Sequence, residues 1–408
     1  RTYYDAAALA TPPVKGAPTR TELWLGGEAR WLASTATYDA YGNRLTETNP
    51  RGATTSYAYD ATYHLYPVSA TDPLGHVATK TWDYLCGLEL TDTDANLRAT
   101  TRTYDTLCRQ TQESTPDGGY TKWSYVNVGT PTTQYVLRSV SDGTANDLWD
   151  KTFFDGLNRP YLTEAEPATG TVGYKVTTTY DTRGLTASTS APYASGETAK
   201  LTTFTYDAIG RKTQETRPDA STRKYLYGDW SMTVCDELGK PRSEFRDGYG
   251  RVKQVREYTG KTCVLAPACT VGTDCFDTTI GYDLLDNVVT VTDAKALVAT
   301  ATFDTAGRKT QMTDPDLGTW RYAYDDAGNL TSQTDARGQT LTMAYDLLGR
   351  RTTTTVAATG AVVSTLAYDQ AGHGDGVGRM TSMTDLSGST SWSWDSMGQE
   401  TSKTQVIG

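Results

Sequence analysis

The chain has 408 residues and a net charge of −10, with 74 threonines, 27 tyrosines and only 3 histidines. This acidic balance disfavours binding to nucleic acid or to an anionic membrane surface. Threonine, tyrosine and tryptophan favour strands, so the composition argues against a helical bundle or a Rossmann-type enzyme. So few histidines leave little material for histidine-based metal or acid–base chemistry.

An aromatic residue followed by aspartate recurs along the chain and divides it into repeats. The aspartates at 283, 304, 325 and 346 follow one another at intervals of 21 residues. After each pair come two variable residues, then Gly-[Arg/Asn], a threonine-rich alternating run, a second turn and another alternating run. The copies of the pair are Tyr38-Asp39, Tyr59-Asp60, Trp82-Asp83, Tyr104-Asp105, Phe154-Asp155, Tyr180-Asp181, Tyr206-Asp207, Cys235-Asp236 (with cysteine in the aromatic place), Tyr282-Asp283, Phe303-Asp304, Tyr324-Asp325, Tyr345-Asp346, Tyr368-Asp369 and Trp394-Asp395.

Each repeat is predicted to be a hairpin. Trp320, Tyr322 and Tyr324 alternate along the chain, which places them on one face of a strand. Turn residues interrupt the alternation at both ends, so strands of about 6–8 residues should pair antiparallel. We name the turn after the aromatic-Asp pair the YD turn and the turn at the other end of the hairpin the second turn. We expect the aspartates and arginines to cap the turns and form ion pairs, and the tyrosines of successive repeats to stack as a ladder.

The predicted fold class is all-β: a long antiparallel sheet of these hairpins, coiled into a spiral shell or solenoid, because open sheets rarely exceed about ten strands without curling. We expect one continuous repeat domain. Its parts are 1–37, leading strands or a linker from preceding repeats; 38–260, a divergent array; 261–278, a cysteine-containing insertion loop; and 279–408, a regular array. Both ends resemble cuts through a larger protein, and we expect no signal peptide and no membrane span.

The six cysteines suggest disulfides. Cys86 and Cys108 follow an aromatic residue at the same spacing in successive repeats, so a bond between them is geometrically plausible. Cys263, Cys269 and Cys275 crowd the insertion, with Cys235 as a possible fourth partner. Buried free thiols are the alternative; disulfides would indicate an oxidising compartment.

No segment predicts a catalytic, cofactor-binding or metal-binding residue. Residues 92–96 imitate the opening of an EF-hand loop, but Leu97 and Thr103 replace its essential glycine and glutamate. The glycine-rich segment 372–378 is interpreted as an expanded turn, since no helix signal follows it. Aspartate recurs in every repeat, so no carboxylate pair can be singled out for glycoside hydrolysis. The three histidines occupy turn-like settings at His64, His76 and His373.

The repeats resemble the bacterial Rhs, or YD-repeat, family. Segments 38–48 and 206–216 are close to its ideal motif, and the resemblance extends from Tyr38 to Trp394. The family includes shell-forming components of insecticidal toxin complexes, Rhs polymorphic toxins, wall-associated proteins and teneurins. The resemblance implies a strip of hairpins that spirals into a hollow cocoon, often around a C-terminal toxic domain.

The resemblance implies a non-enzymatic shell fragment of a secreted or cell-surface protein, without cofactors. Its partner would be an enclosed C-terminal toxin or another polypeptide of the same full-length protein. The chain has no match to the family's plug and self-cleavage segment or to a toxin tip, so neither activity is assigned to a residue. Two alternatives stay open: an extracellular module that binds glycans through rows of aromatic residues, and a structural surface polymer joined edge to edge.

Overall fold

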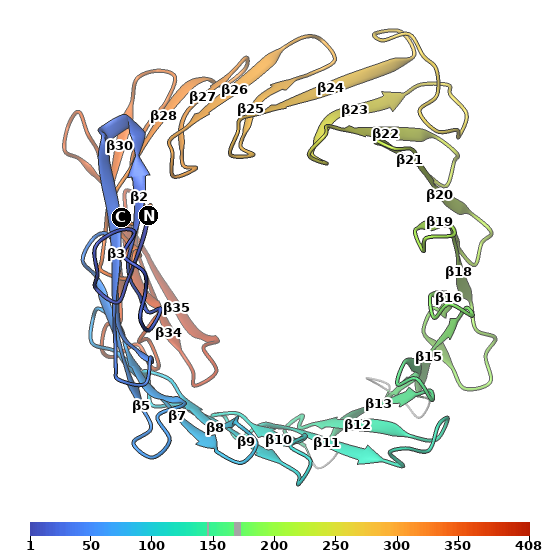
Figure 1. The fold of residues 1–408 in the computed structure, drawn as a ribbon, viewed down its shortest axis with the longest axis horizontal. Coiled ribbons are helices and arrows are strands. Elements are labelled where there is room, and N and C mark those ends of the chain that lie inside the picture. The colour runs from blue at the N-terminus through green and yellow to red at the C-terminus, as the bar shows by residue number, and fades with distance from the viewer. Residues whose placement is uncertain (145–146, 167–172) are drawn as a thin grey trace. The chain divides into compact units, whose positions relative to one another are not determined.

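The computed structural model describes residues 1–144, 147–166 and 173–408 (Figure 1). These residues form 35 strands and one short 3₁₀ helix, η1 at Gly26–Glu28. The paired strands run antiparallel and belong to one long sheet, which confirms the predicted all-β class. Within the described ranges, no helix is long and apolar enough to cross a membrane.

The chain divides into two compact units, one of residues Arg1–Gly118 and Thr300–Gly408 and one of residues Gly119–Ala299. The strands of the first unit, with β26 starting just before its boundary, are β1 (Thr2–Tyr4), β2 (Pro18–Leu25), β3 (Arg30–Tyr38), β4 (Arg44–Thr48), β5 (Thr54–Tyr59), β6 (Pro67–Thr71), β7 (Val77–Asp83), β8 (Leu88–Thr93), β9 (Ala99–Tyr104), β10 (Gln110–Ser114), β26 (Val298–Phe303), β27 (Lys309–Asp314), β28 (Gly318–Tyr324), β29 (Leu330–Thr334), β30 (Thr340–Tyr345), β31 (Arg351–Val356), β32 (Val362–Tyr368), β33 (Met380–Asp385), β34 (Gly388–Trp394) and β35 (Glu400–Ile407). The strands of the second unit are β11 (Tyr120–Val126), β12 (Tyr135–Val140), β13 (Leu148–Phe154), β14 (Pro160–Ala165), β15 (Tyr174–Tyr180), β16 (Thr186–Ser190), β17 (Tyr193–Ala194), β18 (Leu201–Tyr206), β19 (Lys212–Thr216), β20 (Thr222–Tyr227), β21 (Ser231–Cys235), β22 (Pro241–Arg246), β23 (Val252–Tyr258), β24 (Cys275–Tyr282) and β25 (Val288–Thr292).

An aspartate closes most of the turns in the same way. Asp346 shows the pattern: its Oδ1 accepts hydrogen bonds from the backbone N–H groups of Leu348 and Arg350, both at 2.9 Å. The backbone N–H of Gly349 donates to the Asp346 carbonyl at 3.1 Å, and Gly349 has a φ of 75°, which favours glycine. These carboxylates satisfy turn N–H groups that the strand ladder cannot reach, so their predicted role as turn caps is confirmed. The same side-chain pattern recurs at Asp39, Asn49, Asp72, Asp94, Asp105, Asp155, Asp181, Asp207, Asp236, Asp247, Asp283, Asp293, Asp304, Asp325, Asp335 and Asp395.

Arginines that follow the YD turns reinforce these caps. The Arg109 guanidinium donates to Asp105 at 2.7 Å, and this hydrogen bond lowers the pKa of the Asp105 carboxyl. Arg159 and Arg211 likewise lower the pKa of the aspartates four residues before them. The ion pairs are partly exposed, so each contributes modestly, but the pattern repeats along the sheet.

The predicted ladder of stacked tyrosines is wrong. Successive YD aromatics lie on alternate strands, about 9–10 Å apart across the sheet, which is beyond stacking distance. Among the described residues, no ring contact joins the YD aromatics of successive repeats. Instead, Arg350 lies 4.4 Å from the ring centre of Tyr368, and the Tyr368 hydroxyl donates to the Arg351 carbonyl at 2.9 Å. A guanidinium therefore lies over the aromatic ring of the next repeat.

The sheet has very few fully buried apolar side chains. Among the described residues these are Leu25, Leu32, Ala53, Cys235 and Cys275, while most strand residues are only half-buried. Threonine hydroxyls pair across neighbouring strands, as Thr37 does with Thr46 at 2.6 Å and Thr302 with Thr310 at 2.9 Å. Lateral pairing of half-buried side chains thus takes the place of a thick apolar core, which accounts for the abundance of threonine.

Three disulfides link the six cysteines. The predicted Cys86–Cys108 bond is confirmed and joins two successive YD turns, with Cα atoms 5.6 Å apart. Cys235 pairs with Cys263, and Cys269 pairs with Cys275, so Cys235 is indeed the fourth partner of the insertion. The segment between β23 and β24 spans residues 259–274. Its Ala266 N–H donates to the buried Thr233 hydroxyl at 2.9 Å, so the segment lies against a face of the sheet.

The capped turns predict a loss of stability in acid. The pKa values of Asp105, Asp155 and Asp207 are lower in the folded chain than in the unfolded one. These carboxylates therefore stabilise the fold above about pH 4 and cease to do so as pH falls through the folded values. Thermal unfolding followed by circular dichroism at constant ionic strength should show a steady midpoint between pH 5 and 7 and a steep decline from pH 4 to 2. A midpoint that stays level down to pH 2 would contradict this role of the carboxylates.

Removal of a disulfide should lower the stability of the fold more when the disulfide closes a longer loop. Replacing both Cys86 and Cys108 with serine opens a loop with a sequence separation of 22 and should lower the free energy of unfolding in urea by about 3 kcal/mol. The matched control replaces Cys269 and Cys275, whose separation is 6, and should lower it less because a shorter loop loses less entropy on closure. A larger loss for the control pair would refute this reading.

Candidate functional site

The histidines are held by structural partners. His64 has a φ of 54° and stacks on Tyr41 with ring centres 4.0 Å apart. His76 Nδ1 lies 2.7 Å from Asp72, and its Nε2 lies 3.7 Å from Asp369. His373 Nδ1 lies 2.7 Å from the Trp392 carbonyl. The three rings therefore contact residues of turns, and the two carboxylates beside His76 belong to turns as well.

The EF-hand-like segment uses its carboxylates within the sheet. Asp94 Oδ1 caps its own second turn by accepting from the N–H groups of Asn96 and Arg98, both at 2.9 Å. Asp92 lies on β8 with its carboxylate 3.6 Å from Lys80. The carboxylates of Asp92 and Asp94 therefore contact different partners, and these contacts account for the acidic residues of the segment without a calcium ion.

The glycine-rich segment 372–378 is part of an enlarged YD turn. Gly374 packs so close to the Trp394 carbonyl that a Cβ there would lie 2.2 Å from its oxygen. The Asp375 N–H donates to the same carbonyl at 3.0 Å. Glycine is required here for close backbone approach, and the segment forms no helix that could cradle a phosphate.

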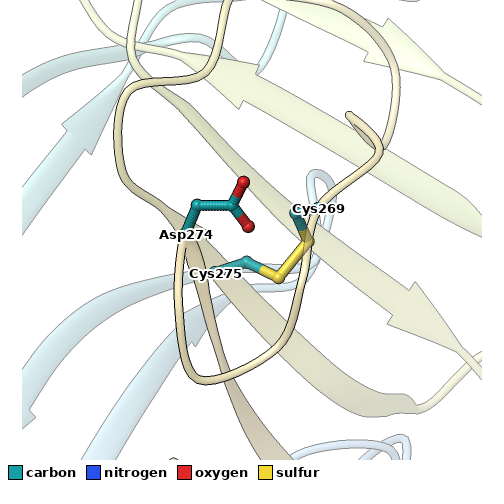
Figure 2. Close-up of side chains that lie close together, drawn as sticks. All are labelled: Cys269, Asp274 and Cys275. Atoms are coloured by element: carbon teal, nitrogen blue, oxygen red, sulfur yellow. A yellow bond between two sulfur atoms is a disulfide. The ribbon is translucent and has the colours of Figure 1, made fainter.

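Cys269, Asp274 and Cys275 are the described residues closest to a metal-binding arrangement (Figure 2). The two sulfurs are bonded to each other, so neither is a thiolate that could ligate an ion. Asp274 forms an ion pair with Lys261 and accepts from the Thr270 N–H at 2.6 Å. The donor set does not fit a metal, and the cluster fastens the segment before β24.

The strongest candidate is a contact between two rows of turns within the first unit. We name it the seam: the second turns of residues 24–98 meet the YD turns of residues 304–378. At one end, the Arg30 guanidinium donates to both carboxylate oxygens of Asp326, at 2.9 and 2.5 Å. The Gly26 N–H donates to the Thr305 hydroxyl at 2.9 Å. These contacts place the turn between β2 and β3 beside the turns that follow β26 and β28.

The middle of the seam contains Arg51. Its NH1 donates to the Asp346 carbonyl at 3.1 Å and its NH2 to the Tyr345 carbonyl at 3.3 Å. Its Nε lies 3.3 Å from Asp325 Oδ2, and the arginine side chain is only 24% exposed. One guanidinium thus bridges two YD turns of another row.

The other end of the seam has a reciprocal pair. The Asn96 amide donates to the Val377 carbonyl at 3.0 Å, and the Val377 N–H donates to the Asn96 amide oxygen at 2.9 Å. Arg98 Nε lies 2.9 Å from Asp375. The seam therefore combines ion pairs and hydrogen bonds that demand one alignment of the two rows.

Sequence reasoning missed the seam because its partners are nearly 300 residues apart along the chain. The sequence separation between Arg51 and Asp346 is 295. One signal was visible: the second turn Asn49-Pro50-Arg51-Gly52 places an arginine at its tip, where the neighbouring second turn has Leu74. Only the structure shows that this arginine enters another row.

Comparison with known proteins supports this architecture. Residues 38–83 and 324–362 match the family model described as RHS Repeat. No curated protein matches the sequence. Among solved structures, the crystal structure of TcdB2-TccC3-TEV is similar with a TM-score of 0.77 and 14% sequence identity, over 95% of this chain and 26% of that chain. TcdB2-TccC3 gives a TM-score of 0.77 at 15% identity, over 95% of this chain and 24% of that chain.

A third solved structure, the Photorhabdus luminescens Tc holotoxin pore, has a TM-score of 0.74 and 14% identity, over 92% of this chain and 25% of that chain. The chain thus spans about a quarter of the length of the chains it resembles, and at these identities the likeness concerns the fold. The matched segments and the capped YD turns show that the chain carries the repeats of the Rhs, or YD-repeat, family.

Proposed function

We propose that this chain is a section of a shell wall that encloses another polypeptide. The seam carries the proposal, because it joins one row of hairpins to another through their turns. Rows that meet in this way build a continuous wall, whereas a flat sheet would leave its turns in solvent. The scarcity of buried apolar side chains fits a wall with two accessible faces better than a globular domain with its own core.

Containment, rather than catalysis, is the proposed mechanism. The recurrent carboxylates are occupied by turn N–H groups and arginines, and the histidines by structural contacts. A wall acts by excluding proteases and folding partners from what it surrounds, which requires no reacting group. We therefore propose that the chain is not an enzyme.

The proposed partner is a toxin or another polypeptide of the same full-length protein. Two of the similar structures pair TcdB2 with TccC3, and a third is a Tc holotoxin pore, which supports a role within a toxin assembly. The three disulfides support export to an oxidising compartment, and hence a secreted or cell-surface location. We also propose that the repeats act as one continuous array, with the cysteine-containing segment as an insertion.

Limited proteolysis of the full-length protein that contains this chain tests containment. The polypeptide outside the repeats should survive a protease concentration that digests the same polypeptide expressed alone. A double Asp325→Ala and Asp346→Ala variant removes two turn caps and should restore digestion. The matched control is Asp316→Ala, because Asp316 is exposed in a second turn that Asp314 caps. Equal digestion of the intact protein and the isolated polypeptide would refute enclosure.

A further inference from the structure

In two repeats, the arginine that follows a capped turn connects that turn to the next one in the same row. Arg308 shows the arrangement: its Nε donates to Asp304 Oδ2 at 2.6 Å, and its NH1 donates to the Asp325 carbonyl at 2.7 Å. In the second unit, Arg251 follows the turn between β22 and β23 that Asp247 caps. It makes the same two contacts, with Asp247 Oδ2 at 2.8 Å and the Asp283 carbonyl at 3.3 Å. Arg308 and Arg251 therefore each bind their own cap and the backbone carbonyl of the next turn.

The repeat after Arg308 has asparagine at this position. The Asn329 amide donates to Asp325 Oδ2 at 2.8 Å, so it reaches the cap of its own turn. Its amide oxygen faces Gly349 of the next YD turn, and an oxygen cannot donate to the Asp346 carbonyl there. The Asp346 carbonyl, which a motif arginine would contact, accepts instead from Arg51 of the other row. Arg51 Nε also lies 3.3 Å from the same Asp325 Oδ2.

Arg51 thus repeats the contacts of the motif arginine from outside the row. Toward Asp325 and Asp346 it places Nε and NH1 as Arg308 places them toward Asp304 and Asp325. Both guanidiniums lie against a carboxylate oxygen and the carbonyl of the next YD turn, which is a pattern that a planar, forked cation satisfies well. The asparagine leaves room for a cation that the neighbouring row supplies.

We propose that Asn329 and Arg51 form a recognition pair that sets the alignment of the two rows in the seam. The flanking repeats carry Arg308 and Arg350, and these guanidiniums already contact the Asp325 carbonyl and the Asp369 carboxylate. A shift of the seam by one repeat in either direction would bring Arg51 against one of these cations. Arg51 is attracted to the carboxylate of the repeat that carries Asn329 and is repelled by the arginines of the flanking repeats. The two rows of turns are therefore held in one alignment.

This inference rests on the proposed function, since it explains how rows of the wall recognise each other. It makes residue 329 a specificity-determining position. An arginine there would contact the carbonyl of the next YD turn in its own row, whereas asparagine leaves that carbonyl to an arginine from another row. The kind of partner that fits such a turn is the second turn of an Rhs-repeat sheet with an arginine at its tip.

A double-mutant cycle in the whole chain tests the pair by hydrogen exchange. Arg51→Gln should speed amide exchange in the turns 346–350 and 49–53 by about tenfold, because both lose a charge-assisted contact. Adding Asn329→Arg to that variant should restore protection at 346–350, since the new arginine supplies the contact from within the row. The turn 49–53 should still exchange fast in the double variant, because the introduced arginine occupies the site at Asp346 that Arg51 contacts in the unmodified chain.

Asn329→Arg alone should expel Arg51 and speed exchange at 49–53 while leaving 346–350 protected. If Arg51→Gln does not fold, Arg51→Lys keeps the charge without the fork and should show the same two effects to a smaller degree. The matched control is Arg337→Gln, because Arg337 occupies the same place in its own second turn but is 79% exposed and pairs with Asp335. It should leave exchange at 346–350 unchanged.

The proposal is overturned if Asn329→Arg changes exchange equally with and without Arg51, or if Arg337→Gln matches Arg51→Gln. These measurements read contacts inside the chain and need no enclosed polypeptide. A failure here would therefore leave the proteolysis test of containment untouched, and a failure of containment would leave the pair intact.

Discussion

Closure of each hairpin turn by an aspartate is the interaction on which the rest of the molecule depends. A reversal of the chain leaves backbone N–H groups that the strand ladder cannot satisfy, and the carboxylate accepts two of them in turn after turn. Where an arginine follows the cap, as Arg308 does, it pairs with the carboxylate and can reach the next turn. The local cap is thereby also the link between repeats, so the order of the sheet propagates from one hairpin to the next.

Such a sheet is stabilised by neighbours rather than by a central core. Few side chains are fully buried, and the threonine pairs, the rings beneath guanidiniums and the tyrosine hydroxyl contacts each join adjacent strands. In repeat proteins the total stability is close to a sum of such nearest-neighbour terms. Disulfides appear where the pattern is interrupted: Cys86–Cys108 joins two divergent turns, and the other two bonds fasten the inserted segment before β24.

The seam shows how a repetitive wall obtains a specific alignment. Identical repeats would allow rows to slide by one hairpin, because each position would look like the next. Departures from the motif remove that degeneracy. The turn that carries Asn329 binds Arg51 through Asp325, Asp326 binds Arg30, and the enlarged turn at Val377 binds Asn96. The divergence of individual repeats, which weakens the sequence pattern, is thus the part of the pattern that carries positional information.

The sequence alone determined the hairpin unit, the all-β sheet and the turn caps, and it made the Cys86–Cys108 bond plausible beside the alternative of free thiols. Each of these features rests on contacts within one or two repeats. Alternation places Trp320, Tyr322 and Tyr324 on one face, and spacing puts aspartate and arginine at one turn. The tyrosine ladder failed because the repeat distance spans two strands, a geometric fact that a linear pattern does not express. Only the tertiary structure decided that Arg51 meets Asp346, since two residues separated by 295 positions meet through the path of the intervening sheet and not through local propensity.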